Sequence, residues 1–404
     1  MIALTGGTIF TMCGQSLKGG TILIDDGKII AVGAGIKLPD DCKHIDVAGK
    51  VVTPGLIDAH THLGVYAESL DWSGEDVNEI SDPVTPALDV IDALNPADVG
   101  LAEAVGGGIT TVMVAPGSAN PIGGQCMIIK TRPRSCVEQM IVKRYAGLKV
   151  AFGENPRRAY GDKKKMPVTR MATAALIRET LQKGREYLAK VDSKDHKFDY
   201  AMEAIVRVLR REMPIRAHAH RADDISTALR IATEFDLDII IEHATEGHLI
   251  ADVLAEHQAR VVLGPLMITK AKLELKESSW RAPALLAEHG VLFALMSDHP
   301  VVPSKFLPVY AGIAARFGLP EEDALKAITI NAAKILGLQD RIGSIEPGKD
   351  ADLVVWSEHP LLLAAKPEWV LIDGQIGQVD AEQRVAAWND FGHKPGLLGG
   401  IEHV

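Results

Sequence analysis

Short apolar segments alternate with helical segments through most of this 404-residue chain, and this alternation constrains its fold more than any other feature. Strands that alternate with helices predict a parallel sheet with right-handed crossovers. Strands that are apolar throughout are buried on both faces, as barrel strands are. About eight such units fit between residues 54 and 340, which favours a closed barrel over an open sheet. The apolar segments include TTVMVAPG, GLKVAFG, PIRAHAH, DIIIEHA, RVVLGP and GVLFALMSD, and helical periodicity appears in MATAALIRETLQKGREYLAKV, ISTALRIATEF and EDALKAITINAAKILG.

Both ends of the chain follow a different pattern. TILIDDGKIIAVG predicts a β-hairpin whose turn is Asp25-Asp26-Gly27. After Leu338 the segments GSIEPGKDADLVVWS and WVLIDGQ return to short strands and turns. We therefore predict an α/β protein of two domains. They are a (β/α)₈ TIM-like barrel over residues 54–342 and a small β-sandwich domain built from residues 1–53 plus 343–404.

The composition excludes several functional classes. Hydrophobic residues make up 47% of the chain and charged residues 24%, which is typical of a globular enzyme. A net charge of −10 disfavours nucleic acid as a partner. No window approaches 18 uninterrupted apolar residues, and the beginning, MIALTGGTIFTMCGQ, lacks the features of a signal peptide. We therefore expect a cytoplasmic enzyme that binds a small-molecule substrate and neither nucleic acid nor a membrane.

The four cysteines indicate no metal site of their own. Cys13, Cys42, Cys126 and Cys136 are far apart in the sequence and form no CxxC pair. This spacing predicts reduced thiols and gives a zinc finger no support.

The segment Asp58-Ala59-His60-Thr61-His62 follows the apolar run VVTPGLI. In a strand, residues i and i+2 point to the same face, so His60 and His62 project together. Two neutral imidazoles that converge on one point form half of a metal site. Although an HxH pair alone is a weak signal, this one ends a buried strand, where barrel enzymes place their chemistry.

Later strand ends carry residues of the same kind. PIRAHAHRADD places His218 and His220 on one face, and IIIEHATEGH places His243 at the end of a strongly apolar strand. LFALMSDHPVVPS ends a strand with Asp298 and His299. Several strand ends bearing His or Asp in one barrel are hard to explain by packing, so together they predict a catalytic metal centre.

These motifs resemble the amidohydrolase superfamily over almost the full length of the chain. VVTPGLIDAHTHLG resembles the first metal strand of that family, and ITINAAKILGLQDRIGSIEPGKDADLVVWSEHPL resembles the stretch that leads from the barrel into the small domain. Within the superfamily, RAHAHRADD and IIIEHATEGH resemble the fifth and sixth strands of the imidazolonepropionase-like and prolidase-like branch. The motifs identify the superfamily and not a substrate.

The resemblance implies a set of roles. His60 and His62 match ligands of one metal, and His218 and His243 match the ligands of the fifth and sixth strands. Asp298 matches the eighth-strand aspartate, which touches metal and shuttles a proton. His220 matches no strict ligand position, so a catalytic role towards the substrate or transition state is implied. The resemblance also implies a divalent metal, foremost Zn²⁺, with one or two ions per chain, and a homo-oligomer.

The fourth strand offers two candidates. Relatives use either a carboxylated lysine or a glutamate there, and GLKVAFGENPRRAYG contains Lys149 within the strand and Glu154 at its end. The two residues face opposite sides of a regular strand, so at most one enters the site unless the strand breaks at Gly153. We favour Glu154 as the ligand, with Lys149 as the alternative carboxylated bridge, because a carboxylate needs no modification to bind metal.

Two further segments lie where a substrate could bind. APGSANPIGGQCMIIKT is predicted as a loop that either shapes the pocket or simply connects two elements. Arg157, Arg158 and Tyr160 are candidates for recognition of a substrate carboxylate, since guanidinium binds carboxylate through two hydrogen bonds.

The sequence therefore predicts a metal-dependent hydrolase of carbon–nitrogen bonds. Its expected substrates are a cyclic amide, an imidazolone-type ring or an X-Pro-dipeptide-like compound. Asp298 would take the proton of the attacking water and pass it to the leaving nitrogen. The alternatives are a deaminase of a heterocyclic amine, which Glu154 as bridging ligand would support, and a non-catalytic scaffold of the same fold.

Overall fold

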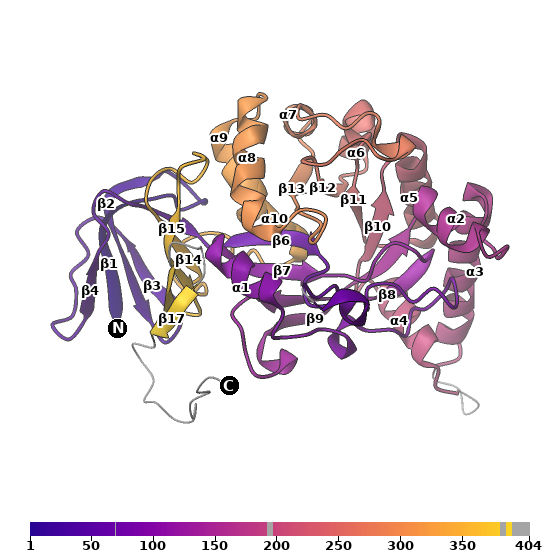
Figure 1. Ribbon diagram of the computed structural model, residues 1–404, viewed down its shortest axis with the longest axis horizontal. Coiled ribbons are helices and arrows are strands. Elements are labelled where there is room, and N and C mark those ends of the chain that lie inside the picture. Colours follow the sequence, from indigo (N-terminus) through magenta and orange to yellow (C-terminus); the bar gives the residue numbers. More distant parts are fainter. Residues whose placement is uncertain (69, 192–196, 380–384, 390–404) are drawn as a thin grey trace.

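The computed structural model describes residues 1–68, 70–191, 197–379 and 385–389, so the end of the predicted small domain, 390–404, lies outside the described residues. Two sheets organise the chain (Figure 1). The small domain lies at one end of the long axis, and helices α2 and α3 lie at the other.

The eight-stranded sheet forms the barrel, and the predicted fold class is confirmed. Its strands follow the order β13-β12-β11-β10-β9-β8-β7-β6. The two ends of this order meet where His62 N donates to His299 O over 2.9 Å. The strands are β6 Leu56–Thr61, β7 Ile109–Val114, β8 Ile122–Lys130, β9 Ile141–Ala151, β10 Ile215–Ala219, β11 Ile239–His243, β12 Arg260–Leu263 and β13 Leu292–Leu295.

One strand of the barrel corrects the prediction of an all-parallel sheet. Strand β8 lies in the segment that we predicted to be a loop, and it pairs antiparallel with both β7 and β9. All of its residues are buried. Strand β8 therefore includes Gly123 and Gly124 as well as the apolar residues Cys126–Ile129, and only the residues between Val114 and Ile122 connect it to β7.

Helices surround the sheet, including those expected over MATAALIRETLQKGREYLAKV and ISTALRIATEF. The Thr169 side chain accepts a hydrogen bond from Ala172 N and so caps α3. The helices are α1 Val99–Gly106, α2 Glu154–Gly161, α3 Arg170–Leu188, α4 Tyr200–Leu209, α5 Ala222–Phe235, α6 Ala251–Glu256, α7 Ala282–Glu288, α8 Leu307–Arg316, α9 Glu321–Ala327 and α10 Ile330–Leu336. Short 3-10 helices are η1 Asp71–Gly74, η2 Val90–Asp92, η3 Val137–Gln139, η4 Gly247–Ile250, η5 Leu273–Leu275 and η6 Ser304–Phe306. Every helix in the described part of the chain is too short or too polar to cross a bilayer.

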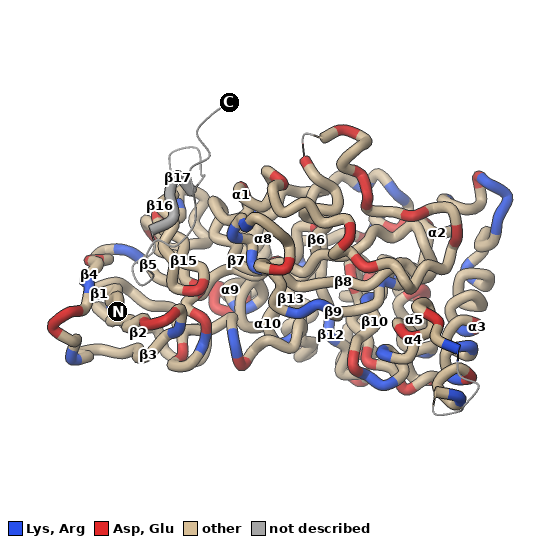
Figure 2. The backbone as a smooth tube through the Cα atoms, turned by 90° about the horizontal axis from the view of Figure 1, so that it is seen from below, with Lys and Arg blue, Asp and Glu red and all other residues tan. Residues whose placement is uncertain are grey.

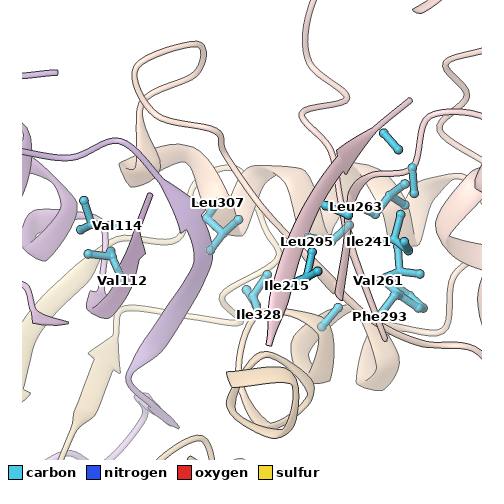
Figure 3. Close-up of a cluster of buried hydrophobic side chains, with 14 of the residues drawn as sticks. Val112, Val114, Ile215, Ile241, Val261, Leu263, Phe293, Leu295, Leu307 and Ile328 are labelled. Atoms are coloured by element: carbon cyan, nitrogen blue, oxygen red, sulfur yellow. The ribbon is translucent and has the colours of Figure 1, made fainter. Parts of the chain in front are cut away.

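The barrel core consists of buried branched side chains. Figure 3 shows Ile215, Ile241, Leu263 and Leu295 from neighbouring strands gathered in one cluster. A second cluster joins strand residues such as Ile57 and the helix α10, which packs against β6, β12 and β13. Both clusters hold the strands in place, so the residues at the strand ends have a rigid support.

The small domain joins the two ends of the chain in one nine-stranded sheet. Its order is β17-β16-β15-β14-β5-β1-β2-β3, with β4 beside β1. The two ends meet where Val52 of β5 pairs with Val355 of β14. Trp356 donates from Nε1 to Thr53 Oγ1 over 2.9 Å and also packs into the barrel core. The strands are β1 Ile2–Ile9, β2 Leu17–Asp25, β3 Lys28–Gly33, β4 Lys43–Asp46, β5 Val51–Pro54, β14 Leu353–Trp356, β15 Pro367–Ile372, β16 Gln375–Val379 and β17 Val385–Asn389.

A buried ionic cluster connects the barrel to this sheet. Lys130, at the end of β8, donates to Asp350 Oδ2 over 3.0 Å, contacts Asp352 and lies 3.4 Å from Asp373 Oδ1. Burial lowers the pKa of Lys130, but the three aspartates outweigh burial and raise it. Lys130 is therefore a charged anchor between the two sheets.

Elsewhere in the described part of the chain, charged residues of both signs are interspersed (Figure 2).

Replacing Lys130 with methionine is expected to lower the free energy of unfolding by about 3–5 kcal/mol, because the aspartates would stay buried without their counter-charge. Urea unfolding of the wild type and the variant measures this difference. Lys326→Met removes a partly exposed helical ion pair with Glu322 and serves as the control, with an expected loss below about 1 kcal/mol. Equal urea midpoints for Lys130→Met and the wild type would contradict the anchoring role.

Candidate metal centre

Four of the predicted ligands, His62, His218, His243 and Asp298, line a cavity of about 710 Å³ at the carboxyl ends of the barrel strands. His60 is in β6, His218 is in β10, and His243 is the last residue of β11. His62, His220 and Asp298 follow their strands directly or within a few residues, and all three line the cavity. The barrel thus brings together side chains that are far apart in the sequence.

Two overlapping groups of candidate ligands share His243. The first contains His60, His243 and Asp298, and the second contains His218, His220 and His243. Within each group the ligand atoms lie within 4.8 Å of one another. His62 adds to the first group, since its Nε2 lies 3.4 Å from Asp298 Oδ1. The overlap leaves room for one ion or for two adjacent ions.

Hydrogen bonds outside the cluster set the protonation of two imidazoles. His62 Nδ1 lies 2.7 Å from Ala115 O, and His243 Nδ1 lies 3.0 Å from Gly264 O. A carbonyl oxygen only accepts, so in both rings Nδ1 carries the proton. The Nε2 atom of each neutral ring therefore keeps a free lone pair, as a metal ligand requires.

His60 is oriented in the same way by a carboxylate. Its Nδ1 lies 2.9 Å from Glu242 Oε1, and its Nε2 lies 3.2 Å from Asp298 Oδ1. Three acceptors, the Nε2 atoms of His60 and His62 and Asp298 Oδ1, consequently face one another. Such atoms repel unless a cation lies between them, so the residues present fit a divalent metal.

The protonation states of the other groups agree with this fit. Burial, aided by His243 and His220, holds the pKa of His218 well below its usual range. Burial likewise holds the pKa of His243 well below its usual range and lowers that of His220 to about 3. Burial raises the pKa of Asp298, but the neighbouring His243, His60 and His62 together outweigh burial and hold that pKa well below its usual range. Neutral imidazoles of His218, His220 and His243 thus lie beside an ionised carboxylate, a donor set that suits zinc.

Glu242 is a functional residue that the sequence analysis missed. It is fully buried, accepts a hydrogen bond from Lys149 Nζ over 2.8 Å and one from Arg216 Nε over 2.6 Å, and contacts His60. Burial raises the pKa of Glu242, but His60, Lys149 and Arg216 outweigh it and hold the carboxylate ionised. Carboxylates that orient a ligating histidine are a common support of metal sites. The sequence feature that could have identified Glu242 is its position as a charged residue within the otherwise apolar run IIIEH.

The fourth strand brings Lys149 to the cluster and leaves Glu154 outside it. Lys149 is buried, lines the cavity, and its Nζ lies 3.4 Å from His60 Nε2. Strand β9 ends at Ala151, and Gly153, with φ of 80°, precedes helix α2 as its N-cap. Glu154 is the first residue of that helix, and the described residues that line the cavity do not include it. Of the two candidates, Lys149 is thus the one that lines the cavity.

The residues suggested for carboxylate recognition also lie elsewhere. Tyr160 is buried, and its hydroxyl contacts Asp82 O and Asn120 Oδ1, each over 2.7 Å. Arg157 donates from Nε to Val168 O over 3.1 Å. Neither residue lines the cavity in the described part of the chain. Their hydrogen bonds connect α2 to neighbouring segments, and a role in substrate binding stays a prediction.

The segment after β13 is held under backbone strain. Asp298 has φ of 57°, a conformation that costs a non-glycine residue free energy and marks functional sites. Asp58 of β6 fixes this segment, since it accepts hydrogen bonds from Ser297 and Ser304. Burial raises the pKa of Asp58 to about 6 in spite of these hydrogen bonds. The neighbouring His299 turns away from the cluster, and its Nε2 lies 3.3 Å from Glu68 Oε1.

Comparison with known proteins agrees with this geometry. Residues 51–380 match the amidohydrolase family. An amidohydrolase of Hapsidospora irregularis is 30% identical over 388 residues, which are 88% of this chain, and the alignment spans 39% of that longer relative. An imidazolonepropionase of Mesorhizobium japonicum is 28% identical over 84% of this chain and 87% of its own length.

Solved structures agree with the fold. An amidohydrolase from Thermotoga maritima is 49% identical, has a TM-score of 0.90, and is matched over 93% of this chain and 98% of its own. A prolidase structure that is 22% identical, with a TM-score of 0.62 over 93% of this chain and 99% of its own, shares the fold. The resemblance to the imidazolonepropionase-like and prolidase-like branch is thus confirmed.

Proposed function

The chain belongs to the amidohydrolase family and is a hydrolase that acts on carbon–nitrogen bonds, and from this premise we propose that it hydrolyses a small cyclic amide, an imidazolone-type ring or an X-Pro-dipeptide-like compound. The proposal is based on the convergence of His60 Nε2 and His62 Nε2 on Asp298 Oδ1, beside a cavity that His62 and Asp298 line. A cavity of about 710 Å³ suits a small molecule.

We propose that His60, His62, His218, His243 and Asp298 hold the divalent metal, with Zn²⁺ as the expected ion and one or two ions per chain. A divalent metal in such a site polarises a carbonyl and lowers the pKa of bound water towards about 7. The chain supplies neutral imidazoles, a carboxylate, and Glu242 to orient His60. The remaining chemistry is proton transfer.

Asp298 is positioned to move that proton. Its Oδ1 faces His60 and His62, it lines the cavity, and its strained backbone is fixed by the hydrogen bonds of the adjacent Ser297 to Asp58. As an ionised carboxylate, Asp298 accepts a proton from the attacking water and then donates it to the leaving nitrogen. These two proton transfers need one carboxylate close to both the water and the leaving nitrogen. Among the described residues that line the cavity, Asp298 is the one carboxylate.

His220 is proposed to act on the substrate oxygen. Its Nδ1 lies 2.8 Å from Thr245 Oγ1, and its Nε2 lies 3.7 Å from Glu274 Oε1. If Thr245 donates to Nδ1, the neutral ring carries its proton on Nε2 and can donate it to a developing oxyanion. The pKa of His220, lowered to about 3 by burial, keeps the ring neutral at physiological pH.

We propose Lys149, rather than Glu154, as the residue that the fourth strand contributes. Lys149→Met is expected to lower the metal content from about two ions per chain to one or fewer, because a lysine in this position can bridge two metals once carboxylated. Glu154→Gln is the matched control and is expected to keep the wild-type ratio. Elemental analysis of both purified variants measures the ratio. Loss of metal from Glu154→Gln, with Lys149→Met unchanged, would reverse the assignment.

The deaminase alternative loses its main support in this geometry. It was tied to Glu154 as bridging ligand, and that residue begins helix α2 outside the cavity lining. A decisive assay incubates the Zn²⁺-loaded protein with cyclic amides, X-Pro dipeptides and heterocyclic amines. New carboxylate and amine without free ammonia is the expected result for the first two classes. Ammonia release from the amines, with no hydrolysis of the amides, would favour the deaminase instead.

A further inference from the structure

Lys272 stands out in the wall of the cavity. It lies in the loop that follows β12, just before η5, and lines the cavity together with Ile268, Thr269 and Leu275 of the same loop. Its Nζ donates to Asn155 Oδ1 over 2.7 Å. The side chain is half-buried, so its ammonium group has given up part of its hydration.

The ammonium group of Lys272 is hydrogen-bonded to a neutral side chain. In the described part of the chain, no ion pair joins Lys272 to a carboxylate, and its hydrogen-bond partner, Asn155, is neutral. Lys149, the other lysine that lines the cavity, is bonded to Glu242 over 2.8 Å. Glu274 accepts a hydrogen bond from Glu154 N at Oε2 over 3.1 Å, and Lys272 lowers its pKa through their charges without a direct ion pair between them. A cation left unpaired in a binding cavity is available to an anionic ligand group.

Asn155 connects Lys272 to the metal centre. Its Nδ2 donates to Ser118 Oγ over 2.8 Å and lies 3.4 Å from His218 Nε2. The side-chain amide of Asn155 therefore lies between Lys272 and His218 and contacts both. Ser118 and Lys272 lie in the loops after β7 and β12, and Asn155 lies in the first turn of α2, so three separate segments build this corner of the cavity.

We propose that Lys272, positioned by Asn155, binds a carboxylate of the substrate adjacent to the carbon–nitrogen bond that is cleaved. This inference rests on the proposed function and narrows it to N-acyl amino acids, dipeptides or cyclic amides that carry a free carboxylate. The short path from Lys272 to His218 requires the carboxylate to lie close to the bond that breaks. Apolar neighbours in the cavity, Ile268 and Leu275, suit an apolar acyl group or ring.

The expected signature separates binding from chemistry. Lys272 contacts neither the reacting carbon nor the groups that hold the metal, so its loss should affect substrate and transition state equally. Lys272→Met is expected to raise KM for carboxylate substrates about 10- to 100-fold, with kcat nearly unchanged, because a hydrogen bond to a charged group is lost. Lys272→Arg keeps the charge and should recover most of the affinity.

The experiment measures KM and kcat for pairs of substrates, each pair an X-Pro dipeptide and its C-terminal carboxamide. The enzymes are the Zn²⁺-loaded wild type, Lys272→Met and Lys272→Arg. Lys276→Met, an exposed lysine of the same loop, is the control and should behave as wild type. Calorimetric binding of a non-hydrolysable phosphonate analogue of an N-acyl proline, and of its carboxamide, gives a readout independent of turnover. The wild type should prefer the acid at least about 10-fold, and Lys272→Met should lose this preference.

Two different outcomes would contradict the role of Lys272 and the proposed substrate class. If the wild type cleaves and binds acids and carboxamides equally, or if Lys272→Met keeps the preference for acids, the role of Lys272 is wrong while the hydrolase function stands. If the metal-loaded wild type cleaves neither series and binds neither analogue, both the proposed substrate class and the inference drawn from it are wrong.

Discussion

Asp298→Asn is expected to lower kcat by about three to four orders of magnitude on a substrate that the wild type hydrolyses, which is the upper range for loss of a general acid–base group. Asparagine keeps the size and one oxygen of the side chain but cannot take up a proton at neutral pH. Because the carboxylate serves both water and leaving nitrogen, both proton transfers are affected. Steady-state kinetics on matched protein preparations measures the effect.

The control must separate proton transfer from metal binding, since Asp298 Oδ1 also faces His60 and His62. Metal content is therefore measured on the same samples, and a fall in kcat with unchanged metal assigns the effect to the proton. Asp340→Asn, at an exposed position, should keep wild-type turnover. Near-normal turnover of Asp298→Asn would show that another group moves the proton.

Removal of the metal by a chelator is expected to lower activity about 1,000-fold or more, because several kcal/mol of transition-state stabilisation depend on it. The temperature of unfolding should fall as well. Without a cation, the acceptor atoms of His60, His62 and Asp298 face one another unscreened in a buried site. Activity assays and thermal melts before and after dialysis measure both changes.

Restoration completes this test. Adding Zn²⁺ back to the dialysed protein should recover activity and thermal stability together, since the same ion accounts for both. Full activity in protein shown to be metal-free would refute a role of the metal in catalysis. Recovery of stability without activity would separate a structural ion from a catalytic one.

The barrel and most of the site follow from local sequence patterns. Apolar strands must be buried on both faces, and a parallel barrel places all their carboxyl ends on one side. His60, His218 and His243 therefore had to converge, whatever the details of the loops. Strand β8 escaped prediction because it runs antiparallel and contains Gly123 and Gly124, residues that are more typical of loops.

The errors lie where the backbone departs from regular geometry. Alternation along a strand places Lys149 and Glu154 on opposite faces, but it cannot tell where the strand ends; in the structure β9 stops at Ala151 and a helix follows. Glu242 could have been inferred, because a carboxylate in a buried apolar strand must be paired. Lys272 could not, since the path of the long loop after β12 depends on tertiary contacts.

The most direct test of the central claim is the metal content of the purified wild-type protein, measured by elemental analysis after equilibration with Zn²⁺. We predict one or two ions per chain, bound at the site that His60, His62 and Asp298 form. The metal-to-chain ratio should decrease strongly in the His60→Ala variant. A ratio near zero after Zn²⁺ supplementation would contradict the account, as would an unchanged ratio in His60→Ala.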